Sequence, residues 1–192
     1  MDRNNEIQRS IEQSRVPILP FELTLAKNAL KVHVEKQSDL SAKMRDAMNQ
    51  SSETWHDNAP AEVIANDSRN LAKIAEKTIN ILGNADVFDY EANPEEGVTL
   101  GSLVDVRYGN SPDVTSLVLT GVSRELTPDL AENINNDKKV NVVTLSSPIG
   151  KAIFGKSIGQ KASFTVGGES TITLTIESIK QISTVSTENT EN

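Results

Sequence analysis

The residues best suited to chemistry are acidic side chains gathered in one stretch of the sequence. Every charged residue between Arg45 and Arg69 is a carboxylate, and these are Asp46, Glu53, Asp57, Glu62 and Asp67. Mg²⁺ takes oxygen ligands and often uses only one or two carboxylates, keeping water for its other positions. The stretch therefore predicts a concentrated negative point that can help to hold Mg²⁺. The alternative is a solvated acidic loop without a ligand.

Two rarer side chains lie in the same stretch. His56 stands next to Asp57 and near Glu53, so the three side chains could converge on a metal ion or share an acid–base role. A single loop histidine is more commonly a plain surface residue, and both interpretations stay open. Trp55 is the only tryptophan of the chain. It would pack either on a partner or against the bend of its own chain.

A long helix is predicted before this acidic stretch. The segment from Phe21 to about Gln50 contains no Gly or Pro and is rich in strong helix formers. Two interleaved rows of residues, each with a spacing of seven, form a narrow stripe along one side of this helix, called the seam here. The rows are Leu23, Leu30, Gln37 and Met44, and Ala26, His33, Leu40 and Ala47. A seam this narrow favours a single partner helix.

That partner is predicted from Pro60 to Leu82, because proline fits a first helical turn and Gly83 can end the helix. Its rows are Ile64, Leu71 and Thr78, and Asp67, Ile74 and Ile81. This spacing is typical of an antiparallel coiled-coil hairpin with arms of roughly 35 to 45 Å. An ordinary helix bundle is the alternative, although no third long helix is predicted to complete one.

After Gly83 the pattern changes to short alternating runs that predict a small antiparallel sheet. The predicted strands are residues 103–108, 114–121, 140–145, 161–166 and 171–182. Turns are expected at Gly109-Asn110 and Gly167-Gly168. Ser147-Pro148 predicts a short capped helix that ends at Gly155. The expected segments are an N-terminal extension (1–20), a hairpin (21–85), a linker (86–97), a β domain (98–183) and a disordered tail (184–192).

Composition restricts the class of protein. The 192 residues carry a net charge of −8, which argues against nucleic-acid binding by the protein's own surface. A protein or cation partner is favoured. The chain has no cysteine, which excludes disulfides and Cys-ligated zinc. No apolar run is long enough to span a membrane, and the polar start MDRNNEIQRS is unlike a signal peptide, so a cytoplasmic location is expected.

The stretch SSPIGKAIFGKSIGQKASFTV resembles the signature of the FKBP-like C-terminal domain of GreA/GreB-type transcript-cleavage factors. In that signature, Ser-Pro opens a helix and a Gly-Lys-x-x-Gly turn leads into a strand. The matching residues are Ser147, Pro148, Gly150, Ala152, Gly155, Lys156 and Gly159. Upstream, SETWHDNAPAEVI resembles the hairpin-tip motif of the family, and NADVFD resembles the segment after the second helix. The resemblance covers roughly residues 21–182.

The resemblance implies an α+β fold, with an N-terminal antiparallel coiled-coil hairpin followed by a small FKBP-like antiparallel β domain. It implies that the hairpin enters the secondary channel of bacterial RNA polymerase while the β domain grips the channel rim. In the family, two tip carboxylates help to hold the second catalytic Mg²⁺ of the polymerase, which then hydrolyses the 3′ end of backtracked RNA. The factor itself would be a monomer, without a cofactor of its own and without enzymatic activity.

Asp57 and Glu53 are the residues expected to carry this role here. When residues 57–59 are aligned with the Glu-Asn-Ala of the family, Thr54 stands where the first acidic residue is usual, and Glu53 lies one position earlier. The missing acid leaves a second hypothesis open, a Gre-fold regulator that occupies the channel without efficient cleavage.

Residues in both parts of the chain are expected to contact the polymerase. They are Trp55 and His56 at the tip, and Ser147, Pro148, Lys151 and Lys156 in the signature. Lysines beside a surface turn need no function, so the signature contacts have a plain alternative. A prolyl isomerase is disfavoured because such pockets are usually lined with aromatic rings, which are few in the second domain. A further alternative is a coiled-coil adaptor protein, and in that case the similarity to the family signature would be a coincidence.

Overall fold

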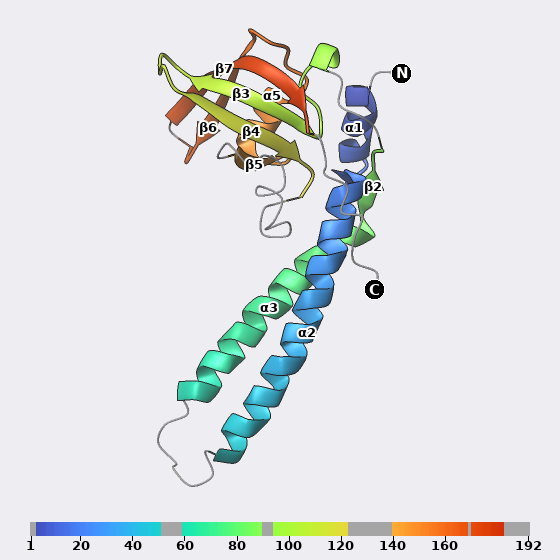
Figure 1. Ribbon diagram of the computed structural model, residues 1–192, viewed down its shortest axis with the longest axis vertical. Coiled ribbons are helices and arrows are strands. Elements are labelled where there is room, and N and C mark those ends of the chain that lie inside the picture. Colours follow the sequence, from blue (N-terminus) through green and yellow to red (C-terminus); the bar gives the residue numbers. More distant parts are fainter. Residues whose placement is uncertain (1–2, 51–58, 90–93, 123–139, 169, 183–192) are drawn as a thin grey trace. The chain divides into compact units, whose positions relative to one another are not determined.

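A computed structural model describes residues 3–50, 59–89, 94–122, 140–168 and 170–182 of the chain (Figure 1). It divides into two compact units, which are residues 1–23 with 84–192, and residues 24–83. Within the described residues, no helix has both the length and the apolar character that a membrane span requires.

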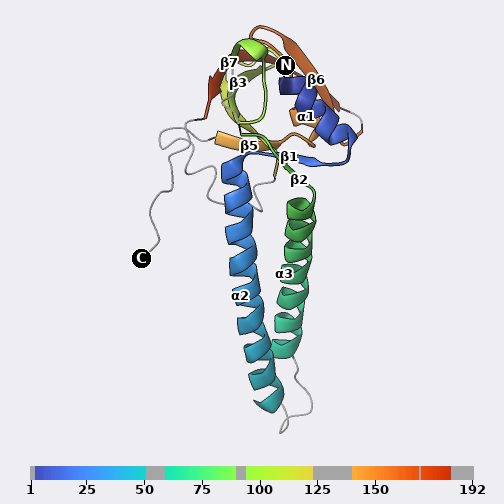
Figure 2. The same cartoon turned by 90° about the vertical axis from the view of Figure 1, so that its right-hand side faces the viewer.

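The second unit is the predicted hairpin. Helix α2 spans Pro20–Gln50 and helix α3 spans Ala59–Gly83, each within two residues of the boundaries expected from the sequence. The two helices run antiparallel and side by side, as both views show (Figures 1 and 2). Proline lies at the start of both helices, and glycine lies at the end of α3, as expected from the fixed φ of proline and the preference for glycine at helix ends.

The seam between the helices has the predicted spacing on α2, and on α3 the predicted Ile64, Leu71, Ile74, Thr78 and Ile81 are half-buried or buried. The half-buried residues of α2 include Leu30, His33, Gln37, Leu40 and Met44. On α3 the prediction was wrong for Asp67, which is exposed, because a carboxylate without a partner stays hydrated. Ser68 takes that position instead, and its Oγ accepts a hydrogen bond of 2.6 Å from Nε2 of Gln37.

The first unit is built on a five-stranded sheet in the order β5-β4-β3-β7-β6. Its strands are β3 (Ser102–Tyr108), β4 (Val114–Thr120), β5 (Val140–Thr144), β6 (Lys161–Val166) and β7 (Ser170–Gln181). The predicted runs are confirmed within two residues. The expectation of an entirely antiparallel sheet was wrong, because β4 and β5 are parallel. Parallel neighbours need a long connection, which residues 121–139 supply in place of a tight turn.

The short predicted helix is α5, Pro148–Ile153, and it closes one side of the sheet core. Ile153 is fully buried in the same cluster as strand residues of β3, β4 and β7, namely Val104, Val106, Leu117, Leu119, Leu174 and Ile176. The signature segment is therefore part of the core that makes this unit stable.

Residues 1–20 do more than the expected extension. They form α1 (Arg3–Glu12) and β1 (Val16–Ile18), and β1 pairs in parallel with β2 (Ala85–Val87). Ile7 and Ile18 are fully buried, and Ile7 belongs to the core cluster of the sheet. Ile7 is an isolated apolar residue in a polar segment and Ile18 lies in a short run broken by Pro17, so neither gives a periodic signal in the sequence, which is why the packing was missed.

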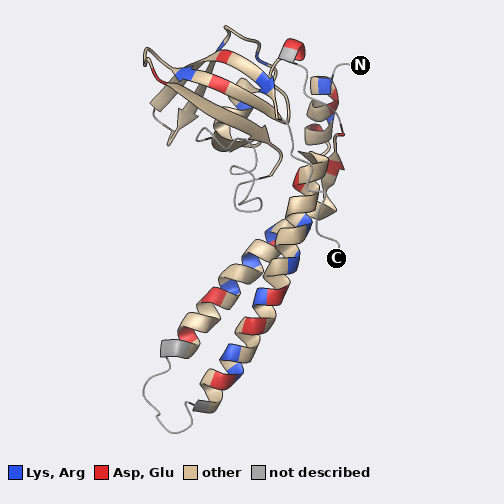
Figure 3. Ribbon diagram, viewed as in Figure 1, with Lys and Arg blue, Asp and Glu red and all other residues tan. Residues whose placement is uncertain are grey.

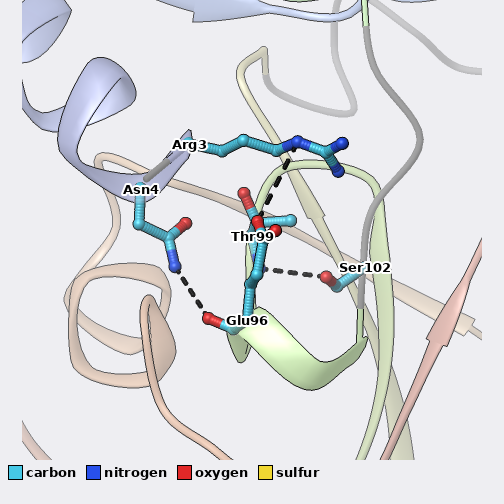
Figure 4. A network of polar contacts seen from close by, with 5 residues as sticks. All are labelled: Arg3, Asn4, Glu96, Thr99 and Ser102. Carbon is cyan, nitrogen blue, oxygen red and sulfur yellow. Dashed lines mark hydrogen bonds and ion pairs between the residues drawn. The ribbon is translucent and has the colours of Figure 1, made fainter. Parts of the chain in front are cut away.

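The expected linker is also partly structured. It contains β2 residues and the 3-10 helix η2, Pro94–Glu96, against which α1 is held. Asn4 donates a hydrogen bond of 3.1 Å from Nδ2 to the Glu96 carbonyl, and Arg3 Nε lies 3.9 Å from Glu96 Oε2 (Figure 4). Beside them, the Ser102 hydroxyl accepts from the Thr99 amide at 3.0 Å and steadies the entry to β3.

Candidate functional site

The residues predicted to do chemistry lie between the two hairpin helices. Glu53, Thr54, Trp55, His56 and Asp57 fall within residues 51–58, which lie outside the described part of the chain. The hypothesis for them therefore stays a prediction. What the structure supplies is their setting, because α2 ends at Gln50 and α3 begins at Ala59.

The described acidic residues nearest to this segment are exposed. Asp46 lies in the last turns of α2, Glu62 in the first turn of α3, and Asp67 further along α3 (Figure 3). Across the described residues, no three His, Asp or Glu side chains gather as a metal ion would require.

The predicted signature forms a capped helix with little freedom in its first turn. The Ser147 hydroxyl accepts from the Gly150 amide at 3.1 Å and donates to the Thr144 carbonyl at 2.6 Å. Pro148 occupies the first turn, where its missing N–H costs nothing. A Cβ on Gly150 would lie 2.0 Å from the Thr144 carbonyl oxygen, so a side chain cannot fit there.

The end of the signature is bonded to the segment that enters the sheet. The Gly155 amide donates to the Val98 carbonyl at 2.8 Å, and the Val98 amide donates to the Lys156 carbonyl at 2.8 Å. Gly97 has a φ of +85°, and a Cβ there would lie 3.0 Å from the carbonyl oxygens of Gly155 and Lys156. Gly97 is therefore a structural partner of the signature, whereas the sequence had indicated only a linker glycine.

The predicted contact residues of the signature differ in their availability. Both hydrogen-bonding roles of the Ser147 hydroxyl are used within the domain. Pro148 and Lys151 are exposed and Lys156 is half-buried, all within one short segment. The structure therefore leaves Pro148, Lys151 and Lys156 able to touch a partner, and that contact stays a prediction.

A buried carboxylate that the sequence analysis missed connects the start of α2 to the sheet. Glu22 accepts a hydrogen bond from the Leu19 amide at 2.8 Å through Oε2, and from the Gly121 and Val122 amides at 2.9 and 3.2 Å through Oε1. Burial raises the pKa of Glu22 to about 7, although the three N–H donors oppose the shift. The available signal was its position, since a glutamate in the first helical turn can bond back to the capping residue.

With this geometry in place, comparison with known proteins identifies the C-terminal part of the chain. Residues 93–181 match the family model described as the C-terminal domain of the transcription elongation factors GreA/GreB. Residues 93–181 belong to the GreA/GreB family. The predicted resemblance is thereby confirmed for the domain that holds the signature. No curated protein matches the chain by sequence.

Solved structures of Gre proteins also match, at low similarity. The GreA factor homolog 1 (Gfh1) of Thermus thermophilus is 19% identical with a TM-score of 0.39, and the match covers 86% of this chain and 99% of that protein. The GreA/GreB factor of Nitrosomonas europaea is 15% identical with a TM-score of 0.31, covering 86% and 97%. At these TM-scores the likenesses carry no argument about the function of this chain.

Proposed function

We propose that the chain is a transcription elongation factor that binds bacterial RNA polymerase and stimulates cleavage of backtracked RNA. The observation that carries this proposal is the GreA/GreB C-terminal domain at residues 93–181. The helical hairpin of residues 24–83 supports it, because a long two-helix arm suits insertion into the secondary channel. The protein would work in the cytoplasm, where the polymerase is.

At the hairpin tip, Glu53 and Asp57 are the proposed active carboxylates. They would act near the catalytic Mg²⁺ of the polymerase, while the nuclease chemistry remains with the polymerase itself. The factor would thus need no cofactor of its own, and it would meet the RNA 3′ end only inside the polymerase. Trp55 and His56 are proposed to contact the channel wall beside them.

A second function is favoured by one specific observation, the threonine at position 54. The family motif has an acidic residue at this position. Asp57 therefore matches one of the two family carboxylates, whereas Glu53 lies one position before the other. A regulator that occupies the channel without efficient cleavage fits this tip. Both functions require polymerase binding, and they differ only in the chemistry.

Polymerase binding is tested with full-length variants of the signature surface. Deleting the β domain would expose Ile7 and Leu19, which pack in the same core cluster as the strands, and this could disturb the rest of the chain. Point variants are therefore preferable. The double variant Lys151→Glu with Lys156→Glu is expected to lose co-purification with polymerase. Lys161→Glu, an exposed lysine at the start of β6, is the matched control and is expected to bind normally. Wild-type protein that fails to bind polymerase would refute the proposed function.

Cleavage is tested on a stalled, backtracked elongation complex by following the shortening of the RNA. Asp57→Asn is expected to abolish cleavage and to leave binding intact, because the amide keeps the size of the carboxylate and loses its charge. Glu53→Gln is expected to reduce cleavage, and Asp67→Asn, which alters an exposed acid of α3, serves as the control. A wild type that is inert but gains activity with Thr54→Asp would establish the non-cleaving regulator.

A further inference from the structure

Two polar side chains meet across the middle of the hairpin seam. Gln37 of α2 donates a hydrogen bond of 2.6 Å from Nε2 to Oγ of Ser68 on α3. Apolar seam residues lie on either side of this pair along the helices, and they include Leu30, Leu40 and Leu71. The pair therefore interrupts the apolar packing of the seam.

These polar groups do not add stability to the seam. Oε1 of Gln37 is buried and has no hydrogen-bond partner within the described residues, and the same holds for Nδ1 of His33 one turn earlier. A buried polar atom without a partner lowers the free energy of unfolding, so an apolar residue of similar size at position 37 would pack more favourably. In paired helices, a polar residue in the apolar seam lowers stability but specifies the register of the pairing. Register is therefore the property that Gln37 and Ser68 are suited to control.

The pair lies where other restraints on the register are weak. At the base of the hairpin, β1 leads into α2 and β2 follows α3, and the two strands form a parallel ladder. Ser68 lies about 22 Å along α3 from Gly83, and the start of α3 lies about 14 Å farther on. In this outer part of the hairpin, residues 38–50 and 59–67, several seam residues bury little apolar surface because they are alanines, namely Ala47, Ala61 and Ala65. The outer part therefore depends on the Gln37–Ser68 pair for its register more than the base does.

A slip of the helices by one turn illustrates what the pair prevents. Moving α3 along α2 by three or four residues brings Leu71 or Ile64 level with Gln37, and Nε2 of Gln37 loses its acceptor. The apolar rows repeat at intervals of three and four residues, so they would still meet apolar rows after such a slip. The hydrogen bond therefore distinguishes between pairings that apolar packing alone would accept.

We propose that Gln37 and Ser68 are positioning residues, whose hydrogen bond sets the register of the outer part of the hairpin and thus the relative height of the two helix ends at the tip. For RNA cleavage this rests on the proposed function, because the segment with Glu53 and Asp57 joins those two ends. A slip of one turn moves one helix end past the other by about 5 Å. A misplacement of about 1 Å near a reacting centre already costs about a hundredfold in rate, so the slipped hairpin would not support cleavage.

The register is measured on the full chain by pulsed EPR between two spin labels. The chain has no cysteine, so Lys43→Cys with Glu62→Cys introduces labels at two exposed positions only. The two positions are level with each other, since each lies six residues from the Gln37–Ser68 pair toward the tip. The expected distance distribution is a single narrow peak.

Gln37→Leu is expected to broaden this distribution or to add a second peak, with the helix content by circular dichroism unchanged. Its free energy of unfolding in urea is expected to equal or exceed that of the wild type, because an apolar side chain replaces a buried amide. Asn70→Leu, which removes an exposed amide of α3, is the matched control and should leave the distribution unchanged. An unchanged distribution in Gln37→Leu would overturn the proposal, as would a loss of stability in place of a change in register.

An exchange of the two side chains tests the hydrogen bond itself. Gln37→Ser shortens the donor side chain and should broaden the distribution. Gln37→Ser combined with Ser68→Gln restores the bond in the opposite direction and should restore the narrow peak. An exchange variant that stays as broad as Gln37→Ser would contradict the role of the bond.

Cleavage of backtracked RNA separates positioning from binding. With Gln37→Leu, the cleavage rate at saturating factor is expected to fall about tenfold or more, while the factor concentration that gives half the maximal rate stays within about twofold of wild type. The exchange variant should recover the rate. A Gln37→Leu protein with the full saturating rate would overturn the positioning role in cleavage. If the wild type gives no cleavage, the stimulating function fails, and the spin-label distances still decide whether the pair sets the register.

Discussion

The buried carboxylate of Glu22 should give the stability of the sheet unit a pH dependence that glutamine at this position removes. Glu22 is fully buried, and its carboxylate accepts three backbone N–H groups from Leu19, Gly121 and Val122. Burial raises its pKa from 4.5 to about 7. Glutamine keeps the size of the side chain and cannot titrate, so Glu22→Gln isolates the effect of the ionisable group.

The sign of the effect follows from proton uptake. Between pH 4.5 and about 7, the folded protein holds a proton on Glu22 that the unfolded chain has released. The free energy of unfolding therefore falls as the pH rises through this interval. The stabilisation is fully present below about pH 4.5 and is lost above about pH 7. A shift of roughly 2.5 pH units corresponds to a loss of about 3 kcal/mol.

Urea unfolding at several pH values measures this loss, and the methyl NMR signals of Val104 and Leu119 report on the sheet unit specifically. The unfolding free energy of the wild type minus that of Glu22→Gln is expected to fall by about 3 kcal/mol between pH 4.5 and pH 7. Glu35→Gln, an exposed glutamate of the same helix, should stay within about 0.5 kcal/mol of wild type at each pH. If the unfolding free energy of the wild type instead rises with pH relative to that of Glu22→Gln, the N–H donors outweigh burial and the reasoning is refuted.

Three further substitutions test the packing of the sheet unit by urea unfolding. Ser147→Ala removes the cap of α5 and should lower the free energy of unfolding by about 1 kcal/mol, and an unchanged value would contradict the capping role. Gly150→Ala should cost about 1–3 kcal/mol or more, because its Cβ would meet the Thr144 carbonyl oxygen. Ile7→Ala should cost about 2–5 kcal/mol and expose α1 to protease, whereas Ile11→Ala, at a partly exposed position of α1, should cost less.

The sequence by itself determined the local elements, because their signals lie in neighbouring residues. Pro60 and Gly83 located the ends of α3, the absence of Gly and Pro from residue 21 to residue 50 located α2, and the spacing of seven located the seam of α2. Alternation of apolar and polar residues located the strands. The Ser-Pro to Gly-Lys signature predicted α5 and its cap, since the bonds of a helix cap join residues three apart.

The candidate site was predictable only as a segment. The sequence alone shows the acidic stretch and the position of Glu53 one residue before the usual family acid. It also predicts that this stretch lies between two helices. Whether Glu53 and Asp57 approach each other depends on backbone geometry that composition and spacing do not encode. That part of the hypothesis therefore rests with the cleavage assays.

Only the tertiary structure decided which distant residues meet. The parallel pairing of β4 with β5, the burial of Ile7 in the sheet core and the contact of Gly97 with the signature all join segments far apart in the chain. Glu22 shows the physical reason most clearly, because its burial depends on Gly121 and Val122 about 100 positions away. Local preferences fix helices and strands within a few residues, whereas the free energy of burying a side chain depends on every segment that excludes water from it.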